Sequence, residues 1–384
     1  MKTYKLGELI TQRREKNNET GLPIRGVSRE GLIPPKQIDA DTSIYNVFYL
    51  RDFIFNPARM ELNSIAFNDK YEKAICSSLY EVFYVHREDI VLPEYLKLIV
   101  KQDWFTRYCE FLGQGSAREY CRFANISEIN IELPDIETQK KAVYCDKVIN
   151  ERIALKRRIN DNLAQQAICI IQKTKEQDSV AGKTWSSLTV QDLVDRSYIA
   201  PPMDGNHGEI HPKVSDYVAS GVPFIMANNL NDGYVDYENC AFITEQQACT
   251  LRKGFAKSKD VLITHKATLG RIAIVSNEYE TTILTPQVTY YRALNYISPE
   301  FLRYFFETSE FQKNFEAWAG AGSTRAYIGI TKQLELPILL PNEDSMRAIT
   351  ESISKIEAMR YNNHLEIIKL SNMQKILLSE ISSR

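Results

Sequence analysis

The sequence predicts an α+β protein made of two homologous halves, each a mixed α/β region followed by a long helix. Three observations predict this class. Matching segments recur 206 to 208 residues apart in the same order, short β-branched and aromatic runs alternate with turns in each half, and each half ends in a long stretch almost free of Gly and Pro. A colinear repeat of this kind is typical of a duplicated chain. The two halves are therefore expected to share one fold, related by a pseudo-twofold axis.

The repeat rests on several short segments. "LRDFIFN" at 50–56 matches "SKDVLIT" at 258–264, and "LPEYL" at 92–96 matches "SPEFL" at 298–302. A Gly-x-Gly-Ser-x-Arg segment follows in each half, and each half then reaches a Leu-Pro pair. Because the order is the same in both copies, a chance match is improbable.

Strand-like runs fill the first part of each half. "NVFYLRDFIF" and "SLYEVFYV" in the first half, and "ETTILTPQVTYYRA" in the second, are rich in aromatic and β-branched residues and are separated by Gly, Pro and Asn. After each Leu-Pro pair the composition changes to helix formers. We therefore expect four segments: a mixed region (1–136), a long helix (137–178), a second mixed region (179–343) and a second long helix (344–384).

Each long helix carries apolar residues at heptad spacing, the pattern of a coiled-coil seam. The simplest arrangement pairs the two helices with each other, antiparallel, and the other interpretation is a stripe that drifts toward solvent. Two polar residues interrupt the rows at equivalent places in the repeat, where a polar side chain can fix register. The predicted seam residues are Ile149, Ile153, Lys156, Leu163, Ile170, Ile349, Ile353, Ile356, Asn363, Ile367, Leu370 and Leu377.

Composition excludes several classes of protein. The formal net charge is -2, with 44% apolar and 25% charged residues, which is typical of a globular chain and argues against wholesale coating of nucleic acid. No apolar run approaches the roughly 18 residues of a membrane span, so we expect no membrane association and a cytoplasmic location. The seven cysteines are odd in number and contain no C-x-x-C pair, which indicates neither a disulfide framework nor a zinc ribbon.

The glycine segment "FLGQGSARE" at 111–119 has the spacing of the loop with which many methyltransferases hold S-adenosylmethionine. The companion Asn-Pro-Pro-aromatic segment is missing, since "NPARM" at 56–60 lacks the second proline and the aromatic residue, and no amphipathic helix follows the glycines. His207 and His211 have metal-ligand spacing but lie among Gly and Pro, where a loop is expected. We therefore expect no cofactor, no metal and no catalytic residue. An adenine methyltransferase or fused restriction enzyme stays as an alternative.

This plan of variable region, Gly-Ser loop, Leu-Pro and long helix, written twice, resembles the specificity subunit of type I restriction-modification systems. The residues that carry the resemblance are "YKLGELI", "SREGLIP", "KDVLIT", "GSARE", "GSTRAYIGITKQLELPILLP" and "LPDIETQKKAV", and it covers essentially the whole chain. The family's helix-opening Glu-Gln pair is kept only loosely, as Glu137 and Gln139, and is replaced by Asp344 and Met346 in the second half.

The resemblance implies a DNA-binding function without catalysis. Each mixed region would be a target-recognition domain that reads one half of a bipartite, asymmetric double-stranded DNA site, and the paired helices would set the spacer between the half-sites. Two methyltransferase subunits would be partners, and the sequence leaves open whether restriction subunits join them. A coiled-coil scaffold that does not read DNA is the remaining alternative.

The candidate DNA-binding residues are polar and basic side chains in matching loops of the two halves. Arg, Lys, Asn and Gln suit base edges, and Arg, Lys, Ser and Thr suit phosphates. The glycine segments are included because short side chains allow close approach of the backbone, although a purely structural turn explains them as well. The candidates are Arg25, Ser28, Arg29, Arg59, Ser116, Arg118, Asn228, Asn229, Asn231, His265, Lys266, Arg271, Ser323, Arg325 and Lys332.

Overall fold

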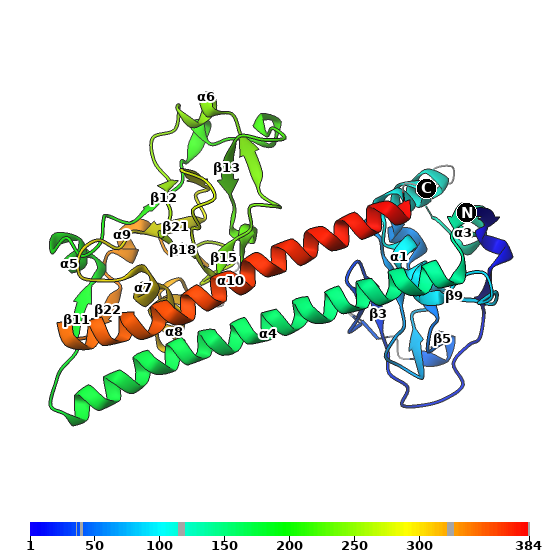
Figure 1. The fold of residues 1–384 in the computed structure, drawn as a ribbon, viewed down its shortest axis with the longest axis horizontal. Coiled ribbons are helices and arrows are strands. Elements are labelled where there is room, and N and C mark those ends of the chain that lie inside the picture. Colours follow the sequence, from blue (N-terminus) through cyan, green and yellow to red (C-terminus); the bar gives the residue numbers. More distant parts are fainter. Residues whose placement is uncertain (36, 39–40, 114–119, 321–325, 383–384) are drawn as a thin grey trace. The chain divides into compact units, whose positions relative to one another are not determined.

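The chain forms two compact units, each of which combines one mixed α/β region with a stretch of both long helices (Figure 1). Unit 1 consists of Met1–Ala154 and Glu366–Arg384, and unit 2 of Leu155–Leu365. The long helices are α4 (Ile136–Val180) and α10 (Glu343–Ser382). The computed structural model describes residues 1–35, 37–38, 41–113, 120–320 and 326–382.

The mixed region of unit 1 is built from short strands and three helices. Its strands are β1 (Lys2–Lys5), β2 (Ile10–Arg13), β3 (Gly26–Ser28), β4 (Gly31–Ile33), β5 (Asn46–Tyr49), β6 (Phe53–Phe55), β7 (Ile65–Phe67), β8 (Lys73–Cys76), β9 (Glu81–Val85) and β10 (Asn130–Leu133). Its α-helices are α1 (Pro93–Val100), α2 (Asp103–Gly113) and α3 (Phe123–Ser127), and its 3-10 helices are η1 (Leu6–Glu8), η2 (Thr42–Ile44) and η3 (Pro57–Leu62).

The central sheet of unit 1 has the strand order β2-β9-β6-β7, and three two-stranded pairs surround it. All three residues of β6 are buried, and Phe53 stacks on Phe83 of β9 with the ring centroids 4.9 Å apart. Helices α1 and α2 pack on the same core, which also takes in Leu378 and Ile381 from the end of α10. The runs seen in the sequence thus form β5, β6 and β9, and β6 and β9 bury side chains on both faces of the central sheet.

The mixed region of unit 2 is larger. Its strands are β11 (Ser186–Thr189), β12 (Met203–Asp204), β13 (Val222–Ile225), β14 (Leu230–Asn231), β15 (Tyr234–Val235), β16 (Ala241–Ile243), β17 (Phe255–Ala256), β18 (Val261–Thr264), β19 (Ile272–Ile274), β20 (Thr282–Leu284), β21 (Val288–Tyr291) and β22 (Pro337–Leu340). Its helices are α5 (Val190–Asp195), α6 (Glu245–Ala248), α7 (Pro299–Phe306), α8 (Ser309–Trp318) and α9 (Ile330–Gln333), with 3-10 turns η4 (Gly208–Ile210), η5 (Val214–Asp216) and η6 (Ala227–Asn229).

Unit 2 has a six-stranded sheet of order β12-β21-β18-β19-β15-β14 and a four-stranded sheet of order β16-β13-β20-β17. Helices α7 and α8 cover the larger sheet with a ladder of rings, in which Phe306 stacks on Phe311 at 4.6 Å and Phe311 stacks on Phe315 at 5.7 Å. This ladder and buried residues of α4 and α10 belong to one hydrophobic core. The mixed region and the helix pair of unit 2 are therefore folded as one body.

The two mixed regions repeat the same topology. In each, the first strand pairs antiparallel with the strand that ends at Leu-Pro, β1 with β10 and β11 with β22. The order β2-β9-β6-β7 in unit 1 matches β12-β21-β18-β19 in unit 2, to which β15 and β14 are added. The prediction of two homologous mixed α/β regions is confirmed. The copies differ by two extra strands at one edge of this sheet and by their remaining strands, which form the sheet β16-β13-β20-β17 in unit 2 and the pairs β3-β4 and β5-β8 in unit 1.

One turn is repeated in detail just before the central strand of each copy. Arg51 and Lys259 both adopt positive φ, of 69° and 70°, and the aspartate that follows each of them accepts the N–H of the residue three positions before it. Both aspartates are buried and bind an arginine through two hydrogen bonds. These paired side chains are Asp52 with Arg13, and Asp260 with Arg292.

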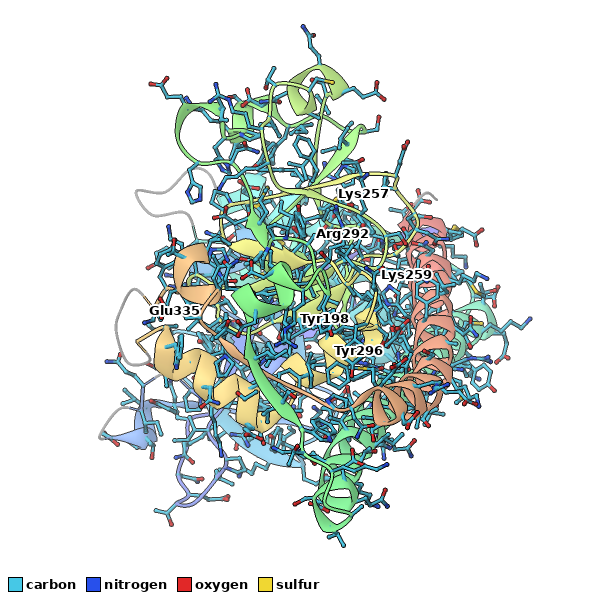
Figure 2. All side chains as sticks on the ribbon, turned by 90° about the vertical axis from the view of Figure 1, so that its left-hand side faces the viewer. Tyr198, Lys257, Lys259, Arg292, Tyr296 and Glu335 are labelled. Atoms are coloured by element: carbon cyan, nitrogen blue, oxygen red, sulfur yellow. The ribbon has the colours of Figure 1, made fainter. Side chains whose placement is uncertain are left out.

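The arginine comes from a different strand in each copy. Arg13 lies on the edge strand β2, whereas Arg292 follows β21, the neighbour of β18. In unit 1 the position that corresponds to Arg292 holds Tyr84, and the Arg13 guanidinium lies 4.7 Å from the centroid of that ring. Figure 2 shows Arg292 between Lys257 and Lys259 at this turn. A buried aspartate needs compensating partners, and the two copies supply a guanidinium to it from different strands.

The long helices begin as the sequence predicts. Asp135 accepts the Thr138 N–H at 2.9 Å and caps α4, and Asn342 accepts the Ser345 N–H at 3.1 Å and caps α10. Within each unit the two helices pack against each other antiparallel (Figure 1). The predicted antiparallel helix pair is confirmed. No helix in the described residues is both long and apolar enough to cross a membrane.

We expect Asp260→Ala to lower the free energy of unfolding of unit 2 by about 3 kcal/mol, because it leaves the Arg292 guanidinium and the Lys257 N–H without their acceptor. Urea unfolding followed by hydrogen exchange of β18 measures this. The matched control is Asp344→Ala, which removes an exposed i,i+3 ion pair with Arg347 and should change the free energy by less than about 0.5 kcal/mol. Equal effects of the two substitutions would contradict a stabilising role for the repeated turn.

Candidate nucleic-acid interface

Two hydrogen bonds between Thr264 and the backbone N–H groups at the end of the loop close the loop that joins β18 to β19 in unit 2. Thr264 Oγ1 accepts the Arg271 N–H at 2.9 Å, and the Thr264 carbonyl accepts the Gly270 N–H at 2.8 Å. His265, at the base of the loop, is fully buried and shares a hydrogen bond with Thr289 Oγ1 at 2.7 Å. Burial lowers the pKa of His265 to about 4, so the imidazole is neutral near pH 7. His265 therefore supports the loop, and Lys266 and Arg271 are its exposed cations.

Aromatic rings lie beside the cations at this end of β18. Lys266 Nζ is 5.8 Å from the centroid of the Tyr327 ring, and Lys332 Nζ is 4.9 Å from that of Trp318. Helix α9, which carries Lys332, is anchored through Gln333, whose amide nitrogen donates to Thr289 Oγ1 at 3.1 Å. We call Lys266, Trp318, Tyr327 and Lys332 the β18 cluster. Lysines next to partly exposed rings suit a nucleic-acid backbone, because they combine phosphate contacts with stacking surface.

The second candidate loop of unit 2 lies elsewhere. The β14–β15 hairpin runs beside the far end of β19, where Tyr234 pairs with Ile274, whereas the 265–271 loop joins the other end of that strand. Asn229 is buried and bonds the Met226 N–H and the Asn239 carbonyl, so it holds the turn together. The structure thus separates the two loops within the sheet.

Asn228 and Asn231 are exposed at the hairpin. The Asn231 side-chain amide donates to the Asn228 carbonyl at 3.0 Å, which joins the two residues across the turn. Both side chains are accessible from solvent, unlike Asn229.

In unit 1 the candidate cations lie on a short hairpin and a 3-10 turn. Arg29 is exposed at the tip between β3 and β4, and Arg59 is exposed in η3. Arg25 is engaged, since its Nε donates to the Tyr71 hydroxyl at 2.6 Å and its guanidinium lies over that ring. Ser28 accepts the Glu30 N–H at 3.2 Å and is part of the turn.

A lysine that sequence reasoning missed lies behind Arg29. Lys101 Nζ donates to the Arg29 and Ile65 carbonyls, both at 2.7 Å. Burial, with a smaller contribution from Lys97 and Arg29, lowers the pKa of Lys101 to about 8. Lys101 therefore orders the β3–β4 tip from inside.

The predicted contacts of the two glycine segments fall on residues that the structure leaves undescribed. Ser116 and Arg118 lie outside the described residues, as do Ser323 and Arg325. After the first segment comes the one-turn helix α3 (Phe123–Ser127), where the sequence predicted none. Short helices of this kind carry too few residues to show an amphipathic period.

His207 is hydrogen-bonded to an aspartate. His207 Nε2 bonds Asp204 Oδ2 at 2.8 Å, and Lys253 pairs with the other carboxylate oxygen. Burial opposes ionisation of Asp204, but these two partners outweigh it and lower its pKa. The described residues contain no group of three or more His, Cys, Asp and Glu side chains placed to hold a metal ion.

Solved structures of type I specificity subunits are similar in fold. The S subunit of a type I restriction-modification system from M. genitalium has a TM-score of 0.54 at 13% identity, over 99% of this chain and 95% of that one. The HsdS subunit from Thermoanaerobacter tengcongensis has a TM-score of 0.39 at 18% identity, over 99% and 96%. A chain from a structure of a type I R-M system complex has a TM-score of 0.43 at 17% identity, over 99% and 97%. No curated protein sequence matches the chain.

The family model for the type I restriction modification DNA specificity domain matches residues 53–165. This segment begins at β6 and ends within α4, so it covers most of the first mixed region and its junction with the long helix. The first mixed region thus matches the type I DNA specificity domain, and the chain as a whole shares the fold of a type I S subunit.

Predicted seam residues lie where the two helices meet in each unit. In unit 1, Ile149 and Ile153 of α4 form a buried cluster with Ile367 and Leu370 of α10. In unit 2, the core formed with the mixed region takes in five more apolar seam residues, which are Leu163, Ile170, Ile349, Ile353 and Ile356.

The two polar seam residues contact each other. Lys156 Nζ donates to Asn363 Oδ1 at 2.8 Å, and the Asn363 amide donates to Asn160 Oδ1 at 2.9 Å. Asn160, which sequence reasoning missed, is buried and also donates to the Arg360 carbonyl at 3.1 Å. That these amides select the register of the helices stays a prediction.

An apolar groove opens between α4 and α10 in unit 1. Its volume is about 400 Å³, and Tyr144, Met373 and Ile376 remain 68%, 56% and 60% exposed. Leu377, a predicted seam residue, lies in this groove. The lining residues are Tyr144, Cys145, Val148, Ile149, Met373, Ile376, Leu377 and Glu380. Clustered apolar exposure on a helix pair is typical of a surface that another helix covers.

Tyr327 and Trp318, the aromatic half of the β18 cluster, were missed in the sequence. Both flank the second glycine segment, in "WAGAGSTRAY", so their place beside a candidate loop was visible. What was not visible is which loop the rings would face, because the Lys266 to Tyr327 contact joins residues far apart in the chain.

We expect the stability of unit 2 to fall by about 2 kcal/mol between pH 7 and pH 5 because of His265, in addition to the effect of other groups. Its pKa falls from 6.5 to about 4 on folding, so the unfolded chain binds more protons in this window and acid favours unfolding. Urea unfolding of the wild type and His265→Gln at both pH values measures the difference. A variant with the same pH slope as the wild type would contradict burial of a neutral imidazole; His364, whose pKa is also lowered, supplies part of the slope common to both.

Proposed function

We propose that the chain is the specificity subunit of a type I restriction-modification system, which reads an asymmetric, bipartite double-stranded DNA site and sets the distance between the half-sites. The target-recognition domains would be residues 1–136 and 179–343, and the spacer helices residues 137–178 and 344–384. The observation that carries the proposal is the β18 cluster. Its exposed lysines lie next to aromatic rings, beside the 265–271 loop, which hydrogen bonds to Thr264 hold closed. Because the two mixed regions share a topology but differ in their loops, the half-sites should differ in sequence.

The proposed contacts divide by exposure. The exposed cations Arg29, Arg59, Lys266, Arg271 and Lys332 suit phosphates and base edges. Asn228 and Asn231 suit base edges, because an amide offers both a donor and an acceptor. The remaining described candidates would act by holding their loops in shape, and these are Arg25, Ser28, Asn229 and His265.

The partners are two methyltransferase subunits, and the groove of unit 1 would receive an amphipathic helix from one of them. A third helix laid between α4 and α10 would cover Tyr144, Met373 and Ile376 in the manner of a helix bundle. At the repeat-equivalent positions of unit 2, Tyr144 and Val148 are replaced by Glu351 and Lys355, so the second copy would dock differently. The complex would act in the cytoplasm, whether or not restriction subunits join it.

Removing the lysines of the β18 cluster should weaken DNA binding and flatten its salt dependence. For Lys266→Ala with Lys332→Ala, we expect roughly tenfold weaker binding near 0.1 M salt and a slope of log K against log salt smaller by about 1 to 2, because phosphate contacts release counterions. Fluorescence anisotropy measures this, with the complete methyltransferase complex and a duplex that carries the site found by methylome sequencing of the source strain.

The matched control removes two lysines from the opposite end of β18. Lys257 and Lys259 are exposed and flank the repeated turn, so Lys257→Ala with Lys259→Ala removes the same charge from the same domain (Figure 2). If this control flattens the salt slope and the β18 cluster variant does not, DNA contacts the other end of the sheet and the proposed interface is wrong.

The groove is tested by placing a charge in it. We expect Ile376→Glu to weaken binding of the methyltransferase subunit about tenfold or more, because covering the groove would then bury a carboxylate. Size-exclusion chromatography with light scattering of the co-expressed subunits measures assembly. Val180→Glu, at an exposed apolar residue outside the groove, is the matched control and should assemble normally. Normal assembly of Ile376→Glu would place the docking surface elsewhere.

A further inference from the structure

Unit 2 contains a buried ion pair between its mixed region and α10. Arg303 of α7 is 0% exposed and donates from Nη1 to Glu357 Oε1 at 2.5 Å, and Glu357 is 8% exposed. Two tyrosine hydroxyls complete the carboxylate's partners, Tyr234 to Oε1 at 2.8 Å and Tyr304 to Oε2 at 2.6 Å. Arg360, one turn along α10, donates to the Tyr304 hydroxyl at 3.0 Å. We call these five residues the Glu357 clamp.

The clamp holds the β14–β15 hairpin against the helix. Gly233 has φ +81°, and a Cβ there would lie 1.9 Å from Arg303 Nη2, so the guanidinium occupies the space that a side chain would take. The Arg303 guanidinium carbon is also 4.7 Å from the centroid of the Tyr234 ring, and His364 of α10 stacks on that ring at 4.3 Å. The hairpin that carries Asn228 and Asn231 is thus fixed on α10 at its tip.

The same hairpin reaches α4. Asp232, next to Gly233, forms an exposed ion pair with Arg157 at 3.4 Å. On the inner side, Asn160 of α4 donates to the Arg360 carbonyl, which links the clamp to the polar seam of Lys156 and Asn363. Polar contacts therefore run without a break from the recognition sheet through α10 to α4.

A buried ion pair adds little stability compared with apolar residues of similar size, but its hydrogen bonds are satisfied in one geometry only. Apolar surfaces tolerate sliding and tilting far better than a carboxylate with three donors. From this we propose that Arg303 and Glu357 are positioning residues that fix the tilt of the second target-recognition domain on the spacer helices, and so contribute to the choice of DNA spacer length. The inference rests on the proposed function.

Unit 1 does not repeat the clamp in its described residues. The position equivalent to Arg303 is Lys97, which follows "LPEYL" as Arg303 follows "SPEFL". Lys97 is half-buried and pairs with Asp69 at 3.1 Å, and the position equivalent to Glu357 is Asn150. Spacer selection should therefore respond to substitutions at this interface of unit 2 and not to those at the matching positions of unit 1.

The test uses the double variant Arg303→Met with Glu357→Gln in the complete methyltransferase complex. It removes both buried charges and keeps similar volumes, and the new amide accepts from one tyrosine hydroxyl through its oxygen and can donate to the other through its nitrogen. Methylome sequencing first defines the wild-type half-sites and spacer, and duplexes with the spacer one base pair shorter, native and one longer then compete for binding. We expect the variant to lose at least fivefold of the wild-type preference for the native spacer, while rejection of duplexes with altered half-sites stays unchanged.

Control variants separate positioning from stability. Glu351→Gln removes an exposed carboxylate of the same helix and should keep the wild-type preference. If the double variant does not assemble, Tyr304→Phe, which removes one hydroxyl from the clamp and keeps the ring, replaces it. An unchanged spacer preference in an assembled clamp variant overturns the inference. A wild-type complex that methylates no bipartite site instead overturns the proposed function.

Discussion

The fold depends on covering the apolar stripes of two long helices. Helix α4 has 45 residues and α10 has 40, and a stripe of that length is not stable in water on its own. In unit 1 the helices cover each other through isoleucine and leucine and then take part in the core of the mixed region. In unit 2 a single core joins both helices to the aromatic ladder of α7 and α8. Both helices thus contribute residues to the cores of the mixed regions and are not free connectors.

Local patterns in the sequence predicted the elements whose formation depends on residues close together in the chain. The heptad rows, the change to helix formers after each Leu-Pro pair and the strand-like runs are short-range signals, so both helices and the repeated sheet followed from them. The relation between loops could not be predicted in this way. The 228–231 and 265–271 segments both contain polar residues, but the parallel pairing of β15 with β19 places them at opposite ends of a strand.

The Glu357 clamp shows a second limit of sequence reasoning. In the heptad pattern Glu357 is an ordinary polar residue of a helix face, and Arg303 is one cation in an amphipathic helix. Their burial arises only when α7, the hairpin and α10 come together, which no local period records. The aromatic residues of the β18 cluster were missed for the same reason, because their neighbours are distant in the chain. Exposed cations stand out in a sequence, whereas the rings that flank them read as core residues.

The repeated turn has a consequence for how such a protein can be recombined. Asp52 and Asp260 occupy the same place in the two sheets, but their guanidinium partners enter from different strands. If the central strand of one copy replaced that of the other, its aspartate would lack the arginine with which it pairs. In unit 1, for example, a tyrosine occupies the position of that arginine. Recombination that changes DNA preference among related chains would therefore have to exchange complete mixed regions. The exchange points would lie outside the β1–β10 or β11–β22 strand pair, so that each buried aspartate is transferred together with its own arginine.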